Sequence, residues 1–198
     1  MSLIFSAFGG LTLFMINPKL TTIILQPIGE VKDTTIFHFL ATELKRIFEL
    51  PVQIKRPISL DTSAYNQERQ QYFAPKILSA LGGYEQTKNE IILGIVDVDL
   101  YVEGLNFIFG QADLVERKAI IATPRLRQEY YGQKPNIKLL QRRALTEAVH
   151  ELGHIFGLNH CPNPNCVMFF SNTLRDTDTK GYKFCPICKR KIFLKDWN

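Results

Sequence analysis

The sequence predicts an α/β (α+β) domain in which helices pack against a mixed, twisted sheet. Three observations predict this class. Short runs rich in β-branched residues, such as residues 20–25 (LTTIIL), are typical of buried strands. Two longer segments, residues 36–48 and 138–156, repeat apolar residues at helical spacing. Such segments follow one another in the order β-α-β-α-β-β-β-α, which favours a sheet covered by helices.

The first part of the domain is expected to contain two strands around one helix. Residues 20–25 form the first strand. Asp33 or Thr34 can cap the helix over residues 36–48, where apolar residues recur every three or four positions. Residues 52–54 alternate apolar and polar side chains close to two prolines, which predicts the second strand.

The middle of the chain is expected to add one helix and three strands before the last helix. Residues 66–81 should be mostly helical, bent at Pro75 and stopped by two glycines at 82 and 83. The nearly continuous apolar run over residues 90–98 predicts a central strand covered on both faces. Residues 105–109 and 119–123 are two further expected strands, and Gly110 starts the connection between them.

Length and composition indicate one folded core with a small appendage. The chain has 198 residues, and 45% of them are hydrophobic. The net charge of +5 comes partly from residues 180–198, which we interpret as a solvated cationic surface, so no nucleic acid is expected as a partner. No apolar segment is long enough to span a bilayer, and no membrane partner is expected. The sequence does not indicate an oligomeric state.

The first residues are set apart from the domain, which is expected to span residues 18–198. Residues 1–17 are apolar but lack the basic start and the small-residue cleavage pattern of a signal peptide. The segment is also short for a membrane span. We interpret it as a non-structural extension or as the product of an upstream start, in which case translation begins at Met15, and a membrane anchor is the alternative.

The segment 150–160 (HELGHIFGLNH) has the layout of a three-histidine zinc site. His150 and His154 lie one helical turn apart, so both imidazoles leave the same face of a helix. Gly157 can end that helix and turn the chain, which lets His160 return as a third ligand. Three of the four histidines of the chain fall here. A metal site is therefore expected, and a helix with merely buried histidines is the alternative.

Glu151 is the expected catalytic residue of this site. Zinc on three neutral imidazoles keeps its double charge and an open position for water, whose pKa falls towards about 7. A carboxylate beside the first ligand can take the proton of that water and later hand it to a leaving amine. Zinc also polarises a scissile carbonyl. The segment therefore predicts amide-bond hydrolysis.

All four cysteines follow the histidine segment. Cys185 and Cys188 form a CxxC turn with basic neighbours, as in a zinc knuckle, and Cys161 and Cys166 can supply the other pair of a tetrahedral site. Two disulfides are the alternative, but they need an oxidising compartment for which no export signal argues. A redox CxxC would need a thioredoxin-like βαβ setting, which is lacking. We therefore expect structural zinc, a four-cysteine subdomain over residues 161–198 and a cytoplasmic protein.

The motif HExxHxxGxxHC, followed by a second cysteine, CxM and a distant CxxC, resembles the archaemetzincin family of zinc peptidases. The resemblance covers residues 150–188. It implies a metzincin-like catalytic domain with catalytic zinc on the three histidines, Glu151 as the base and Met168 as the Met-turn residue beneath the metal. It also implies a structural zinc on the four cysteines, and so two zinc ions per chain.

The resemblance further implies a cleft between an upper sheet domain and a small lower subdomain, with an extended peptide along the edge strand. Residues 105–109 are expected to be that strand. Phe169, Phe170 and Asn172 would lie at the wall or floor of the cleft, or else pack in an ordinary way around the turn.

Two other groups are interpreted as structural. Asp97 and Asp99 follow the central strand and could form an acid–base pair. With Glu151 already placed, a structural or supporting role fits them better. His38 falls on the helix that is rich in core residues and is also expected to be structural.

The predicted function is zinc-dependent hydrolysis of peptide bonds, and an aminopeptidase acting on short peptides is the finer expectation. The alternative is a zinc-stabilised binding protein of the same fold that does not turn peptides over. The complete set of three histidines and Glu151 favours the enzyme. A nucleic-acid module that uses the basic stretch is a more distant alternative.

Overall fold

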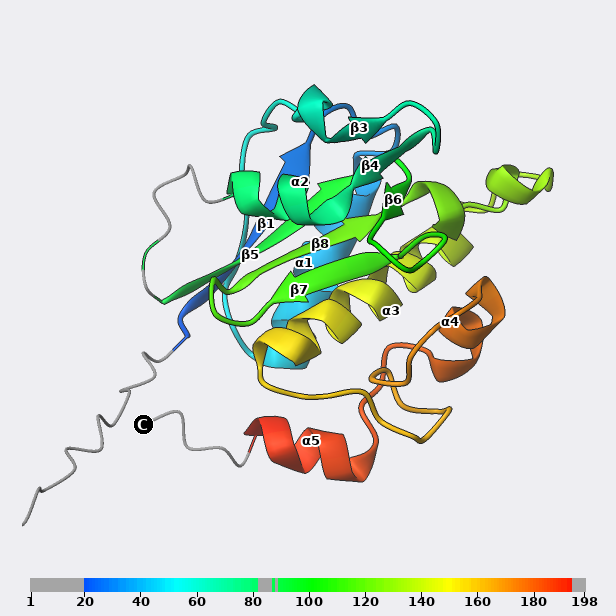
Figure 1. The fold of residues 1–198 in the computed structure, drawn as a ribbon. Coiled ribbons are helices and arrows are strands. Elements are labelled where there is room, and N and C mark those ends of the chain that lie inside the picture. Colours follow the sequence, from blue (N-terminus) through cyan, green and yellow to red (C-terminus); the bar gives the residue numbers. More distant parts are fainter. Residues whose placement is uncertain (1–19, 82–86, 88, 194–198) are drawn as a thin grey trace, which may run out of the picture.

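The computed structural model describes residues 20–81, 87 and 89–193, and a five-stranded mixed sheet lies at its centre (Figure 1). The strand order is β2-β1-β5-β8-β7. Neighbouring strands are parallel except at the edge, where β7 runs antiparallel to β8. The expected extension over residues 1–17 lies outside the described residues. The strands are β1 (Thr22–Ile28), β2 (Val52–Ile54), β5 (Glu90–Val96), β7 (Gly110–Asp113) and β8 (Lys118–Ala122).

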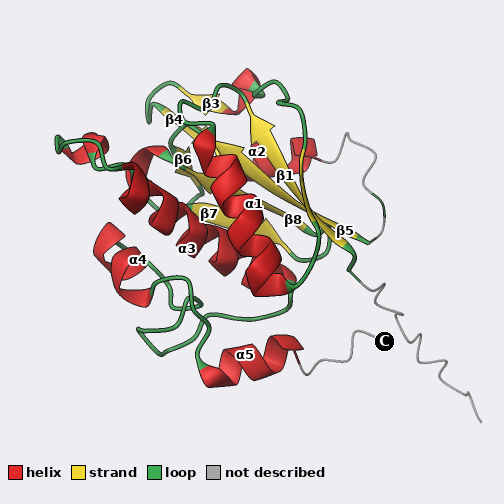
Figure 2. Cartoon of the chain, turned by 180° about the vertical axis from the view of Figure 1, so that it is seen from behind, coloured by secondary structure: helices red, strands yellow, loops and turns green. Residues whose placement is uncertain are grey.

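Helices cover both faces of the sheet, as the apolar run of the central strand predicted. Successive side chains of a strand point to opposite faces. In β5, Ile91 and Leu93 belong to the core beneath α1 and α3, whereas Ile92 belongs to the core on the face of α2. Figure 2 shows α1 and α3 crossing one face together. The central, doubly covered strand is therefore confirmed. The helices are α1 (Thr35–Phe48), α2 (Ala74–Ala80) and α3 (Ile137–Ile155).

The two long helices begin where the sequence supplies capping groups. Asp33 Oδ1 accepts a hydrogen bond of 3.0 Å from the Thr35 amide at the start of α1. Asn136 Oδ1 accepts one of 3.0 Å from the Leu139 amide at the start of α3. Such bonds satisfy amide groups that the first helical turn leaves free. Both helices and the strand β2 lie within a residue of their predicted positions, and β8 begins and ends one residue early.

The prediction of a helix over most of residues 66–81 is wrong in its first half. Two short strands, β3 (Tyr65–Asn66) and β4 (Gln71–Phe73), form a hairpin there, and β6 (Leu100–Tyr101) pairs with β4 to complete a small second sheet. The rings of Tyr65 and Tyr72 pack together across the hairpin, and Gln70 has a positive φ of 54°. Pro75 lies in the first turn of α2, so it starts the helix and does not bend it. The two glycines expected to stop it are outside the described residues.

The prediction of an edge strand over residues 105–109 is also wrong. This segment is a loop with one isolated bridge, between Leu100 and Ile108, and the edge strand is β7, where a connection was expected. The four residues of β7 (GQAD) lack the alternating apolar pattern that marks a strand. A Cβ at Gly110 would lie 2.6 Å from Glu151 Oε1 and 2.8 Å from the Ile120 carbonyl oxygen, so only glycine lets β7 approach α3 this closely.

The chain after the histidine segment packs beneath α3 and adds to the main core. It contains α4 (Leu174–Lys180) and α5 (Pro186–Phe193) and, among its described residues, no strand. Val167, Met168 and Ile192 belong to the core that lies under α1 and α3. In the part of the chain that the structure describes, no helix combines the length and the apolar character needed to cross a membrane. The described residues also include the 3₁₀ turns η1 (Thr62–Ala64), η3 (Pro124–Leu126) and η4 (Glu129–Tyr131).

Candidate metal centres and active site

The three predicted histidines converge at the end of α3. His150 and His154 leave the same face of the helix, and their Nε2 atoms are 3.2 Å apart. Gly157 follows the helix with a φ of 77°, and the chain returns so that the His160 ring lies 5.3 Å from the His150 ring and 4.9 Å from the His154 ring. One nitrogen from each imidazole lies within 4.8 Å of the others. This geometry allows the three rings to share one ion.

Backbone carbonyls orient two of the rings. His150 Nδ1 lies 2.6 Å from the Val167 carbonyl oxygen, and His154 Nδ1 lies 2.8 Å from that of Leu158. A carbonyl oxygen only accepts, so the hydrogen belongs on each Nδ1 and the Nε2 lone pairs face one another. This is the arrangement by which surrounding groups usually fix a zinc-binding imidazole. The donor set therefore fits zinc.

The environment of the site keeps its imidazoles neutral. Burial lowers the pKa of His150 to about 2, and the charge of Lys180 and the neighbouring His154 act in the same direction. Burial also lowers the pKa of His154 and of His160. Neutral imidazoles are the form that binds a metal. The rings are thus ready to bind an ion near neutral pH without first losing a proton.

Glu151 lies between the first two histidines and the edge strand. Its side chain is buried beneath Gly110. Burial raises the pKa of Glu151 to about 8, and the nearby Glu147 raises it further, while Lys180 opposes both. A carboxylate in such surroundings accepts a proton readily. A bound cation would lower this pKa by favouring the charged form.

Met168 packs directly under the histidine helix. Its side chain is fully buried, and a Cβ at Gly153 would overlap its Sδ atom. Gly153 lies between the two helical histidines, so the thioether is in contact with the backbone that carries them. The position is that expected for a Met-turn residue, whose role in this chain remains a proposal.

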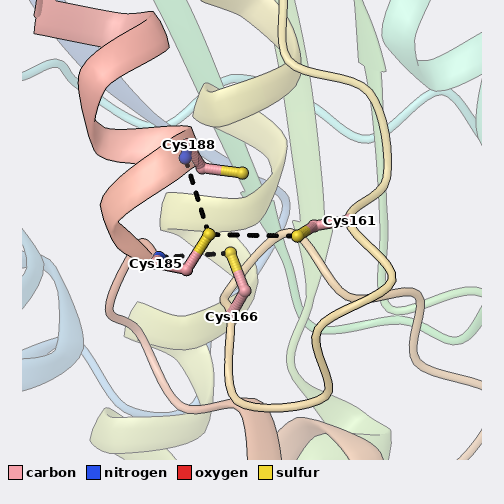
Figure 3. A group of neighbouring side chains, drawn as sticks. All are labelled: Cys161, Cys166, Cys185 and Cys188. Carbon is pink, nitrogen blue, oxygen red and sulfur yellow. Dashed lines mark hydrogen bonds between the residues drawn. The ribbon is translucent and has the colours of Figure 1, made fainter.

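The four cysteines form a second cluster (Figure 3). Their sulfur atoms all lie within 4.8 Å of one another, and Cys161 Sγ is 4.0 Å from Cys185 Sγ. Four thiolates at about 2.3 Å from a tetrahedral zinc would be roughly 3.8 Å apart, so the spacing fits a single ion. The amides of Cys185 and Cys188 donate to Cys166 Sγ at 3.3 Å and to Cys185 Sγ at 3.5 Å. All four are free thiols in the structure, which does not support the two-disulfide alternative.

The segment 161–169 connects the two clusters. A 2.8 Å hydrogen bond from the Cys161 amide to the Met168 carbonyl oxygen closes most of this segment into a loop. Cys161 and Cys166 belong to the sulfur cluster, whereas Val167 and Met168 contact the histidine helix. The two clusters therefore share one short piece of backbone.

Two cavities flank the histidines. The smaller, about 170 Å³, is lined by Glu147, Asn172 and Lys180 among others, and the larger, about 460 Å³, extends along β7 past Gln111. Both are bounded by the 105–109 loop, by Glu151 and by Phe170. The centroid of the Phe170 ring, which lines both cavities, lies 4.9 Å from that of the His160 ring. Phe170 and Asn172 thus line the cleft, which is one of the two positions expected for them from the sequence. Phe169 lines neither cavity.

The structure keeps the residues interpreted as structural away from the site. Asp97 pairs with Arg127 at 3.2 Å, and Asp99 makes two hydrogen bonds of 2.7 Å with Arg125. Asp99 also accepts a hydrogen bond from Gln71 Nε2, which in turn donates to a carbonyl of the 105–109 loop. This network ties the loop to the small sheet. His38 is exposed on α1.

Two functional-site residues were missed by sequence reasoning, Glu147 and Lys180. Both are buried and line the smaller cavity next to His150. Glu147 could have been found, because it precedes His150 by three residues and so shares its helical face. Lys180 is 30 residues from His150 along the chain, and nothing in its local sequence distinguishes it from the other lysines.

Comparisons with known proteins agree on one family. The model of peptidase family M54 matches residues 34–193. The chain is 46% identical to the archaemetzincin of Pyrococcus furiosus over 176 residues, which cover 86% of this chain and 91% of the relative. It is 42% identical to that of Methanocaldococcus jannaschii, with 86% and 92% covered.

Solved structures give the same result. The crystal structure of the archaemetzincin from Archaeoglobus fulgidus, complexed with malonate, is similar with a TM-score of 0.75 and 35% identity, and 87% of this chain and 100% of that chain are covered. The archaemetzincin from Methanopyrus kandleri gives a TM-score of 0.77 and 32% identity, with 88% and 94% covered.

Proposed function

This chain belongs to peptidase family M54, the archaemetzincins, and from this premise we propose a mechanism for it as a zinc metallopeptidase of the metzincin type. His150, His154 and His160 would hold the catalytic zinc, and Glu151 would be the general base. The single observation that supports this assignment is the convergence of three imidazole nitrogens beside a buried carboxylate at the edge of the sheet.

Zinc bound there would supply an activated water molecule and polarise the scissile carbonyl. The protein supplies the rest. Glu151 takes a proton from the attacking water, because its carboxylate is buried next to the histidines and lines both cavities, and returns that proton to the departing amine. The free edge of β7 can pair with an extended substrate backbone, since only its other edge is used by β8. The peptide would then lie over Glu151 between the two cavities.

The finer parts of the proposal concern the second ion and the substrate. A structural zinc on Cys161, Cys166, Cys185 and Cys188 would give two ions per chain, and it would stabilise residues 161–198 as a subdomain of the domain over 18–198. The modest volume of the two cavities supports short peptides as substrates, and we propose cleavage from a free N-terminus. The cytoplasmic location and the lack of a nucleic-acid partner stay predictions.

The test is a peptide-library digest with the wild-type protein and the isosteric Glu151→Gln variant, alongside metal analysis. Loss of the base should lower kcat/KM by roughly 10²- to 10⁴-fold with both zinc ions retained. Cleavage of free but not of N-acetylated peptides would support the aminopeptidase. Two bound ions with no cleavage of any peptide would instead favour the binding protein of the same fold.

A further inference from the structure

A buried ion pair lies directly behind the first histidine of the site. Lys180, the last residue of α4, places its Nζ 3.3 Å from Glu147 Oε1 on α3. The lysine side chain is 0% exposed and the glutamate side chain 3% exposed. Thr177 Oγ1, also on α4, donates a hydrogen bond of 2.8 Å to the same glutamate oxygen. The pair is thus buried and held from both helices.

Lys180 also contacts two parts of the metal site. Its Nζ lies 3.4 Å from His150 Nδ1 and donates to the Phe169 carbonyl oxygen at 3.3 Å. Nδ1 carries its own hydrogen, which it gives to Val167. Lys180 therefore does not donate a hydrogen bond to the ring nitrogen. Its side chain fills the space beside the His150 ring, and its hydrogen bond fixes the backbone at Phe169, two residues after Val167.

Stability alone does not account for this pair. Two charges that leave water oppose folding, and well-packed apolar residues of similar volume often stabilise a protein as well or better. A second ion pair between the same helices shows the contrast. Arg143 and Asp178 make two hydrogen bonds of 2.8 and 2.7 Å, but their carboxylate is 31% exposed, and they contact neither a histidine nor the 167–169 backbone.

We propose that Lys180, oriented by Glu147, is a positioning residue that fixes the His150 ring and the carbonyl that orients it, so that Nε2 is held where the metal binds. The pair acts through the imidazole, as outer partners of metal ligands do. This inference rests on the proposed role of His150 as a zinc ligand. It assigns the pair to metal affinity and not to folding.

The test compares a double variant, Glu147→Leu with Lys180→Met, with Asp178→Ala. The double variant leaves no unpaired buried charge and should keep a thermal stability near that of the wild type. Its histidine site should nevertheless bind Zn²⁺ about 10- to 100-fold more weakly. Asp178→Ala breaks the other pair between the two helices, and its zinc affinity should stay within about twofold of the wild-type value.

Metal affinity is measured by competition with a chelator on the full-length apoprotein. Substitution with Co²⁺ separates the two sites, because thiolate ligands give an intense near-ultraviolet charge-transfer band and imidazoles do not. Wild-type affinity in the double variant overturns the inference and leaves the proposed function intact. A wild-type protein that never fills the histidine site overturns both.

Discussion

The two candidate metal centres lie one residue apart in sequence but are built in opposite ways. The histidine site takes two ligands from a rigid helix, its third ligand is exposed, and cavities open on both sides of it. The cysteine site takes its ligands from a loop and from the start of α5, and three of the four are buried. Catalytic zinc sites keep an open position, whereas structural sites are closed. The difference supports the proposal that the histidine centre meets the substrate and that the cysteine centre stabilises the fold.

The largest effect is expected from opening the closed site with Cys185→Ser. Loss of a thiolate should release the structural zinc and, because structural zinc contributes folding energy, lower the unfolding temperature by more than about 10 °C. The shared segment 161–169 should then shift, and the histidine site should lose its metal as well. Metal analysis and thermal unfolding measure both effects.

The control for this coupling is the neighbouring residue. His160→Ala should empty only the histidine site and leave one zinc per chain, since the cysteines do not depend on an imidazole for their position. Unchanged zinc occupancy of the histidine site in Cys185→Ser would show that the two centres are independent. They would then differ only in how exposed their ligands are.

A smaller effect, confined to the open site, is expected from Gly110→Ala. The added methyl group would displace the Glu151 carboxylate, and a misplacement of about 1 Å can cost roughly 100-fold in rate. Both zinc ions should remain bound. Steady-state kinetics with a cleaved peptide measures the loss.

Gly94→Ala is the matched control for that variant. A Cβ there would meet Ile28 and Ile120 at 2.8 and 2.9 Å on the other face of the sheet, so it crowds the core without reaching Glu151. It should lower stability and leave kcat/KM unchanged. Equal losses of activity in both variants would mean that general crowding, and not the position of the carboxylate, limits the reaction.

The smallest effect is expected from Met168→Leu. The swap nearly conserves volume, and such changes in a core usually cost less than about 1.5 kcal/mol. Branching next to Gly153 should lower the unfolding temperature by only a few degrees, with both ions kept. A loss of histidine-site zinc in this variant would give the thioether a role in metal binding beyond packing.

The sequence predicts those features of the fold and site in which metal binding or burial requires residues at fixed intervals along the chain. The histidines of α3 must lie one turn apart to share an ion, and the apolar run of β5 must be buried on both faces, so both were located from the residues alone. The hairpin at 65–73 depends on the packing of Tyr65 against Tyr72, and its turn at Gln70 has no marked sequence signal. The edge strand β7 is short and polar, and the position of Lys180 follows only from contacts across the fold.

The path of the chain through segment 161–169 has a consequence for biosynthesis. Translation adds Cys185 and Cys188 after every residue of the histidine site. The Val167 carbonyl that orients His150 nevertheless follows Cys166, whose sulfur atom accepts a hydrogen bond from the Cys185 amide. A nascent polypeptide that has exposed only its HExxH segment therefore lacks the anchor for that segment. We expect the growing chain to remain inert on the ribosome, so that proteolytic capability arises only once the last thiols have emerged.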